Sequence, residues 1–132
     1  MTEPTSQTPE EGILWRGWED ATFEFIKQKD KPILLFVADP DPTVAPFLKA
    51  VLGAMPADAK LRALLRDVFP AVLVETKAMP EYLAALGAGT AYHIAVLSPA
   101  GLTPLITLDP RGGKPQEVVA QLVRILEKLR DY

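Results

Sequence analysis

The feature that most constrains the fold of this chain is an unbroken apolar segment, Ile33–Ala38. A strand with one face in water alternates apolar and polar residues, whereas a strand covered on both faces is apolar throughout. The segment shows no alternation, and it is much too short to cross a membrane. We therefore expect a central strand whose sheet has helices packed on both faces, which is an α/β architecture.

The rest of the sequence supplies the helices and strands of such a domain. We expect helices over about 18–29, from the loop at 39–44 to about 52, from 56, over 80–86 and from 114, and strands over 33–38, 71–75, 92–97 and 102–108. Residues 98–101 have the composition of a hairpin turn. This order predicts a single domain over residues 12–132, with a central mixed sheet of about four to five strands flanked by helices in three α/β/α layers. Residues 1–11 are predicted to be a disordered tail.

Three short sequence pieces lie in an order and at separations typical of one family. Trp15 and Trp18 lie at the entry to the first helix, Lys31–Phe36 reads KPILLF, and Leu97–Gly101 reads LSPAG. Together they resemble the tryptophan-rich first helix, the central strand and the final hairpin of thioredoxin-like proteins. The resemblance extends from about residue 13 to the C-terminus. It implies a thioredoxin fold, in which a Cys-x-x-Cys pair would begin the helix that follows the central strand.

The chain has no cysteine at that position or anywhere else. A gap-free alignment with the family places Asp41 and Val44 at the two cysteine positions. Thiol–disulfide exchange requires an attacking thiolate, so thiol–disulfide oxidoreductase activity is excluded. Three further positions depart from the family pattern: Leu35 replaces a buried acid, Pro40 an aromatic residue, and Tyr92 the cis-proline. These concerted changes indicate an abandoned redox site.

Asp41 has two interpretations. Asp is a preferred N-cap and proline is frequent at the first helical position, so Asp41 and Pro42 are expected to begin the second helix. The functional interpretation is that Asp39 and Asp41 form an acidic lip that contacts a partner. On this register Pro46 falls inside the helix, removes one backbone hydrogen bond and is expected to kink it.

Tyr92 also has two interpretations, which the sequence leaves open. The resemblance places it beside the active-site loop, where the family contacts bound peptide. Pro40, Pro42 and Tyr92 would then form an exposed apolar rim for a partner. Alternatively, Tyr92 packs over the prolines and closes the vacated site. The predicted binding surface comprises Asp39, Pro40, Asp41, Pro42, Thr43, Tyr92 and His93.

His93 is the only histidine of the chain, so no site with several histidine ligands can form. It could pair with Asp39, Asp41 or Glu75 as an acid–base set. A lone histidine on a strand more often has a structural role, however. We therefore assign no catalytic residue, no metal and no cofactor from the sequence.

Charge and hydropathy narrow the expected partners. The chain has 14 Lys and Arg against 17 Asp and Glu, a net charge of −3, and no basic cluster along the sequence. A nucleic-acid partner is therefore not expected. No apolar run approaches the ~20 residues that span a bilayer, and the first residues lack a secretory signal pattern. We expect a cytoplasmic protein that does not bind membranes.

The function expected from the sequence is that of a redox-inactive thioredoxin-like protein that binds a protein or peptide partner. Such a protein would be an adaptor, an assembly chaperone or an oligomer subunit. The alternative is a non-redox enzyme or small-ligand binder that uses the vacated active-site cleft. A structural homodimer, paired through an edge strand or an apolar helix face, is a third possibility.

Overall fold

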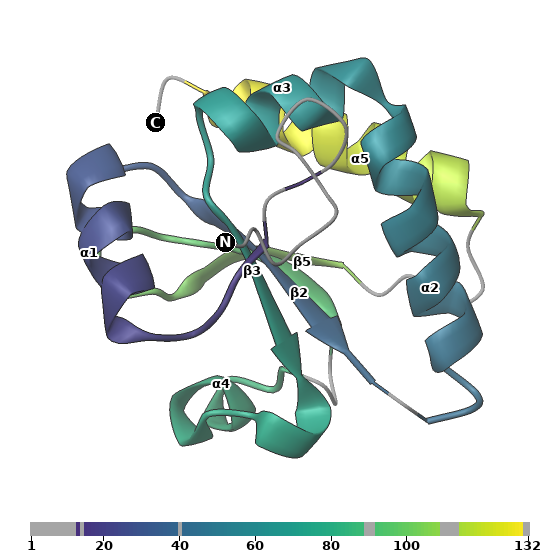
Figure 1. Ribbon diagram of the computed structural model, residues 1–132, viewed down its shortest axis with the longest axis horizontal. Coiled ribbons are helices and arrows are strands. Elements are labelled where there is room, and N and C mark those ends of the chain that lie inside the picture. Colours follow the sequence, from purple (N-terminus) through teal and green to yellow (C-terminus); the bar gives the residue numbers. More distant parts are fainter. Residues whose placement is uncertain (1–12, 14, 40, 89–91, 109–113, 131–132) are drawn as a thin grey trace, which may run out of the picture.

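The computed structural model describes residues 13, 15–39, 41–88, 92–108 and 114–130 (Figure 1). In chain order, the elements are β1 (Trp15–Arg16), α1 (Asp20–Lys29), β2 (Ile33–Ala38), α2 (Ala45–Ala54), α3 (Ala59–Asp67), β3 (Ala71–Glu75), α4 (Glu81–Ala85), β4 (Ile94–Leu97), β5 (Pro104–Leu108) and α5 (Pro115–Lys128). Short 3-10 helices occupy Met55–Ala57 and Thr76–Ala78. The predicted tail, residues 1–11, lies outside the described residues.

The strands form one five-stranded mixed sheet in the order β1-β3-β2-β4-β5. The central strand β2 pairs in parallel with β3 and antiparallel with β4. At the edges, β1 pairs in parallel with β3, and β5 pairs antiparallel with β4. Every residue from Ile33 to Val37 has an exposed fraction of 0%. The predicted central strand and the predicted α/β fold with a mixed sheet are confirmed.

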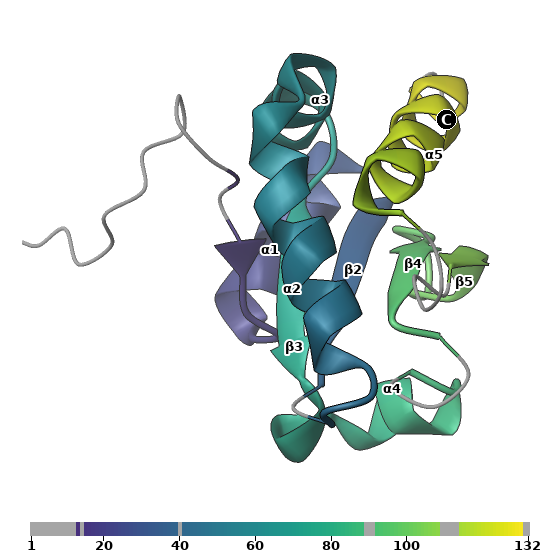
Figure 2. The same cartoon turned by 90° about the vertical axis from the view of Figure 1, so that its right-hand side faces the viewer.

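Helices cover both faces of the sheet and produce three layers. Leu34 and Phe36 of β2 point into a core shared with α2, α3 and α5, whereas Ile33, Leu35 and Val37 point into a core shared with α1 and α4. In Figure 1, α2, α3 and α5 lie above and to the right of the sheet, and α1 and α4 lie to the left and below. Figure 2 shows α2 and α3 following one another end to end, with α5 alongside them.

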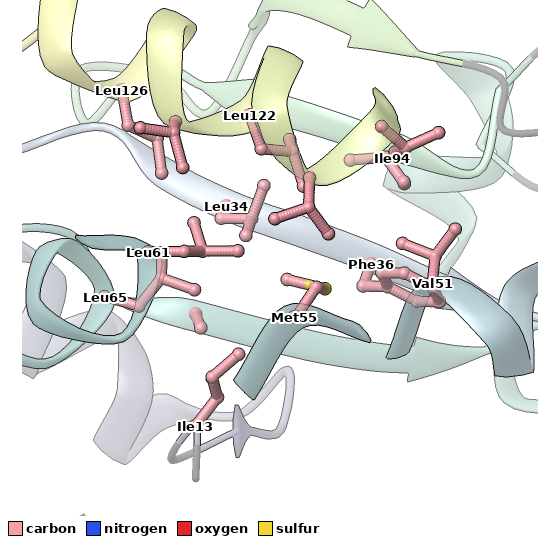
Figure 3. Close-up of a cluster of buried hydrophobic side chains, with 14 of the residues drawn as sticks. Ile13, Leu34, Phe36, Val51, Met55, Leu61, Leu65, Ile94, Leu122 and Leu126 are labelled. Atoms are coloured by element: carbon pink, nitrogen blue, oxygen red, sulfur yellow. The ribbon is translucent and has the colours of Figure 1, made fainter. Parts of the chain in front are cut away.

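The larger of the two cores fixes the position of α2. Figure 3 shows Met55, Leu61 and Leu122 gathered around Leu34 and Phe36 of the central strand. All five side chains are fully buried, and complete burial of such a side chain contributes about 1.5–3 kcal/mol. Because α2 is anchored through this core, its first residues are held at the carboxyl end of β2.

Two element boundaries near this end differ from the prediction. The helix α2 begins at Ala45, so Pro46 lies in its first turn, where no intrahelical hydrogen bond is lost. The expected kink at Pro46 is therefore wrong, because the preceding residues form a separate turn. The strand β4 begins at Ile94, and Tyr92 forms only an isolated bridge with Ala88.

Candidate functional site

The loop where the family resemblance would place the redox motif lies between the carboxyl end of β2 and the start of α2. Its described residues are half-buried Asp39, exposed Asp41, Pro42 and Thr43, and buried Val44. Pro40, a predicted site residue, lies outside the described residues. Val44 has an exposed fraction of only 5% and belongs to the larger core. The second cysteine-equivalent position therefore holds a packing residue and offers no surface group.

Asp41, at the first cysteine-equivalent position, is hydrogen-bonded within its own loop. Its Oδ1 accepts from the backbone N–H of Thr43 at 2.8 Å and from the Thr43 hydroxyl at 2.7 Å. Its backbone carbonyl accepts from the N–H groups of Val44 and Ala45. Asp41 thus caps the turn that leads into α2, while the N-cap position of α2 itself is Val44. The prediction that Asp41 is the N-cap of the second helix is therefore wrong, because its side chain bonds within the turn ahead of the helix.

Asp39 connects the loop to the segment before β4. Its Oδ1 accepts from the backbone N–H of Asp41 at 2.9 Å, and its Oδ2 lies 3.5 Å from Nε2 of His93. The side chain of Asp39 is 19% exposed, whereas that of His93 is only 2% exposed. The carboxylate therefore faces the surface, and the imidazole lies behind it.

His93 is held mainly through its backbone. Its carbonyl accepts from the N–H of Val37 at 2.7 Å, which continues the pairing of β2 with β4 beyond the last strand residues. The Nδ1 atom of its ring is buried and has no hydrogen-bond partner among the described residues. His93 thus combines a structural backbone role with a ring whose polar contact among the described residues is with Asp39.

Tyr92 does not form part of an exposed rim. Its exposed fraction is 4%, and it packs in the core under α1 and α4 together with Leu83 and Ala88. Its hydroxyl is buried and has no partner among the described residues. Burial, followed by the nearby Tyr82, raises the pKa of Tyr92. Of the two interpretations, the exposed rim is wrong, and Tyr92 is a core residue.

A hollow opens directly beside the loop, between α2 and the carboxyl ends of β2 and β3. Its volume is about 370 Å³, and it is lined by Ala38, Asp39, Ala45, Leu48, Lys49, Leu52, Glu75 and Lys77. Alanine and leucine side chains form an apolar floor. Charged groups of both signs lie around it, and Lys77 Nζ is 3.6 Å from Glu75 Oε1. Such a surface can take an apolar group and offer polar contacts around it.

The structure brings together only part of the predicted surface. Asp39 contacts His93 directly, and the pairing of Ala38 with Glu75 brings Glu75 to the same hollow. Asp41 is turned into its own loop. Sequence reasoning missed Lys49, Leu52 and Lys77, although the spacing of Ala45, Leu48, Lys49 and Leu52 along one helix face was a signal for the first two.

The described residues contain neither a cluster of metal-binding side chains nor a membrane-spanning helix. No group of three or more His, Asp or Glu side chains with the spacing of a metal site occurs in this part of the chain. None of the helices described is both long and apolar enough to cross a bilayer.

No protein-family model matches the sequence, and the search of curated proteins found no relative. Among solved structures, the chain is similar to one described as DsbH oxidoreductase, with 18% sequence identity and a TM-score of 0.61. The match covers 96% of this chain and 94% of that chain. At this identity the likeness concerns the fold and not the activity. Together with the five-stranded mixed sheet, it shows that this cysteine-free chain has a thioredoxin-like fold.

Proposed function

We propose that this chain is a redox-inactive binding protein, and that the hollow beside the Asp39–Val44 loop receives a peptide segment of a protein partner. One observation carries the proposal. The helix start that would hold reactive thiols holds a hydrogen-bonded Asp41 and a buried Val44, while an open hollow of about 370 Å³ lies beside it. The scaffold keeps a place for a ligand and has no group for thiol chemistry.

The lining of the hollow favours a peptide with one apolar anchor. Leu48 and Leu52 form a floor large enough for a single apolar side chain, and buried anchors of this kind supply most of the free energy of peptide binding. Lys49, Lys77 and Glu75 surround the floor and can bind backbone or side-chain groups of either sign. The cytoplasmic location expected from the sequence is part of this proposal.

The second candidate, a non-redox enzyme, is supported by the contact between Asp39 and His93. The orientation of the pair limits what such an enzyme could do. A general base must reach its substrate within hydrogen-bond distance or through one water. Only Asp39 meets the surface, because the His93 ring is 2% exposed. The pair is therefore better placed to hold a ligand through the Asp39 carboxylate than to remove a proton with the His93 imidazole.

A peptide selection tests the proposal. A displayed library of random peptides is selected against the protein, and the enriched peptides are compared on two charge-reversal variants. Lys49→Glu changes the hollow, whereas Lys128→Glu makes the same change at an exposed position of α5. We expect enriched peptides that share one apolar residue, bind the Lys128→Glu variant normally and bind Lys49→Glu weakly. No enrichment, or equal binding to both variants, would overturn the proposal.

A further inference from the structure

A group of basic side chains surrounds a small pocket at the opposite end of the sheet. The pocket lies where the chain enters β3, and its volume is about 140 Å³. Arg16 of β1, Lys29 of α1, and Arg62 and Arg66 of α3 line it, and none of the described lining residues is acidic. These positions are far apart in the sequence, so the group becomes visible only in the folded chain.

The local charge is opposite in sign to that of the whole chain, whose net charge is −3. Asp67, beside the pocket, supplies a carboxylate that contacts this group. Arg66 donates from Nε to one Asp67 oxygen at 3.0 Å and from a terminal nitrogen to the other at 3.2 Å. Lys29 donates to the backbone carbonyl of Asp67 and not to its carboxylate. The Asp67 carboxylate therefore pairs with Arg66, and the Lys29 ammonium forms no ion pair among the described residues.

Arg16 is positioned by an aromatic ring. Its guanidinium carbon lies 3.7 Å from the centroid of the Phe25 ring, and the Lys29 ammonium lies 5.7 Å from the same centroid. Arg16 has no ion-pair partner among the described residues. A guanidinium that stacks through its face keeps its N–H edge available for an oxyanion. The stacking on Phe25 fixes the position of the group before a ligand arrives.

The remaining walls of the pocket are apolar. They include Phe25, Val68, Phe69 and Pro70. Charge-assisted hydrogen bonds are stronger where water is partly excluded, so such walls raise the affinity for an anion. The hydrogen bond from Arg66, together with the charges of Arg66, Lys29 and Arg130, lowers the pKa of Asp67.

We infer that this pocket, lined by Arg16, Lys29, Arg62 and Arg66, binds the phosphate group of a small phosphate monoester. The volume is below the roughly 300–1,000 Å³ of sites for drug-sized ligands, so it suits a single headgroup. A phosphate monoester carries about 1.5 to 2 negative charges at neutral pH and so matches several cations better than a carboxylate does. An arginine guanidinium can bind two oxygens of a phosphate group with two parallel hydrogen bonds.

Calorimetric titration of the full chain at low ionic strength tests this inference, with phenyl phosphate, inorganic phosphate and benzoate as probes. We expect phenyl phosphate to bind and benzoate to bind at least about tenfold more weakly, because the charge of benzoate is smaller. Inorganic phosphate shows whether the natural ligand is an organic ester or the free ion. If inorganic phosphate binds more weakly than phenyl phosphate, the ligand is an organic ester; if the two bind equally, it is the free phosphate ion.

Two variants locate the site. Arg16→Gln and Lys29→Gln are each expected to weaken phenyl phosphate binding about tenfold or more, because each removes a charge-assisted contact. Arg124→Gln, at an exposed position of α5, is the matched control and is expected to bind normally. Thermal unfolding of each variant confirms that it is folded. Unchanged binding in both variants, or no saturation by any phosphate at millimolar concentration, would overturn the inference.

Discussion

The Asp39 carboxylate lies 3.5 Å from Nε2 of the buried His93 ring and joins two segments that are 54 residues apart in the sequence. The other oxygen of Asp39 accepts from the backbone N–H of Asp41. One side chain therefore connects the end of the central strand, the loop that replaces the redox motif and the residues before β4. Because Asp39 also lines the hollow, this contact holds part of the proposed binding surface in place.

A double-mutant cycle measures the contact between these two side chains. Asp39→Asn and His93→Gln each remove one partner, and neighbouring polar groups of this kind couple by about 0.5–3 kcal/mol. We expect the free energies of unfolding, measured by urea denaturation, to be non-additive in the double variant. Strict additivity would mean that the two side chains do not interact.

Tyr92 offers a second test, because its hydroxyl is buried without a partner among the described residues. We expect Tyr92→Phe to leave the free energy of unfolding unchanged or to raise it by up to about 1 kcal/mol, since an unsatisfied polar group is removed. Tyr92→Ala is expected to lower it by about 3–5 kcal/mol, as large-to-small core substitutions do. A marked loss of stability in Tyr92→Phe would show that the hydroxyl has a partner.

The same residue gives a pH dependence. Burial raises the pKa of Tyr92 above its ordinary value of 10.0, so folding favours the neutral phenol. Its contribution to stability is therefore complete below pH 10.0 and is lost as the pH rises through the higher folded-state value. We expect the wild-type chain to lose more stability above that pH than Tyr92→Phe does. Identical alkaline limbs for the two proteins would contradict the burial of this group.

Pro46 tests where α2 begins. Because Pro46 lies in the first turn of the helix, Pro46→Ala relieves no strain in the folded state. The substitution only makes the unfolded chain more flexible, and we expect it to lower the free energy of unfolding by about 0.4–1 kcal/mol. Ala50→Pro, in the helix interior, is the contrasting variant and is expected to cost about 3 kcal/mol or more. A stabilising Pro46→Ala would indicate that the proline does interrupt the helix.

Removing the charge of Asp67 tests whether the surroundings of the small pocket attract anions. Asp67→Asn removes the carboxylate that competes with an incoming phosphate for Arg66. We expect phenyl phosphate to bind this variant more tightly than the wild type, and the difference to shrink as salt is added. Weaker binding by Asp67→Asn would mean that Asp67 positions Arg66 for the ligand.

The sequence predicted the features that depend on local patterns. The apolar run Ile33–Ala38 was sufficient for a central strand, because burial on both faces requires apolar residues without alternation. The hydrogen bond of the Asp41 side chain is equally local, since an Asp side chain bonds to N–H groups two residues ahead, but the helix itself begins later, at Ala45.

Features that depend on strand register or on distant elements could not be predicted in this way. Whether Tyr92 points inward depends on where β4 begins, because a shift of one residue turns a side chain to the other face. Of Asp39, Asp41 and Glu75, the three partners that the sequence left open for His93, the pairing of β2 with β4 brings Asp39 beside it. The basic pocket draws side chains from three elements, so a search for clusters along the sequence missed it.

The most direct test of the proposed function is chemical-shift mapping of a selected peptide on the isotope-labelled full chain. If the peptide binds in the hollow, the largest amide shifts are expected at residues 38–52 and 75–77. Lys49→Glu is expected to abolish these shifts, and Lys128→Glu is expected to leave them unchanged. Shifts centred on any other surface, or equal shifts in both variants, would contradict the assignment of the hollow as the binding site.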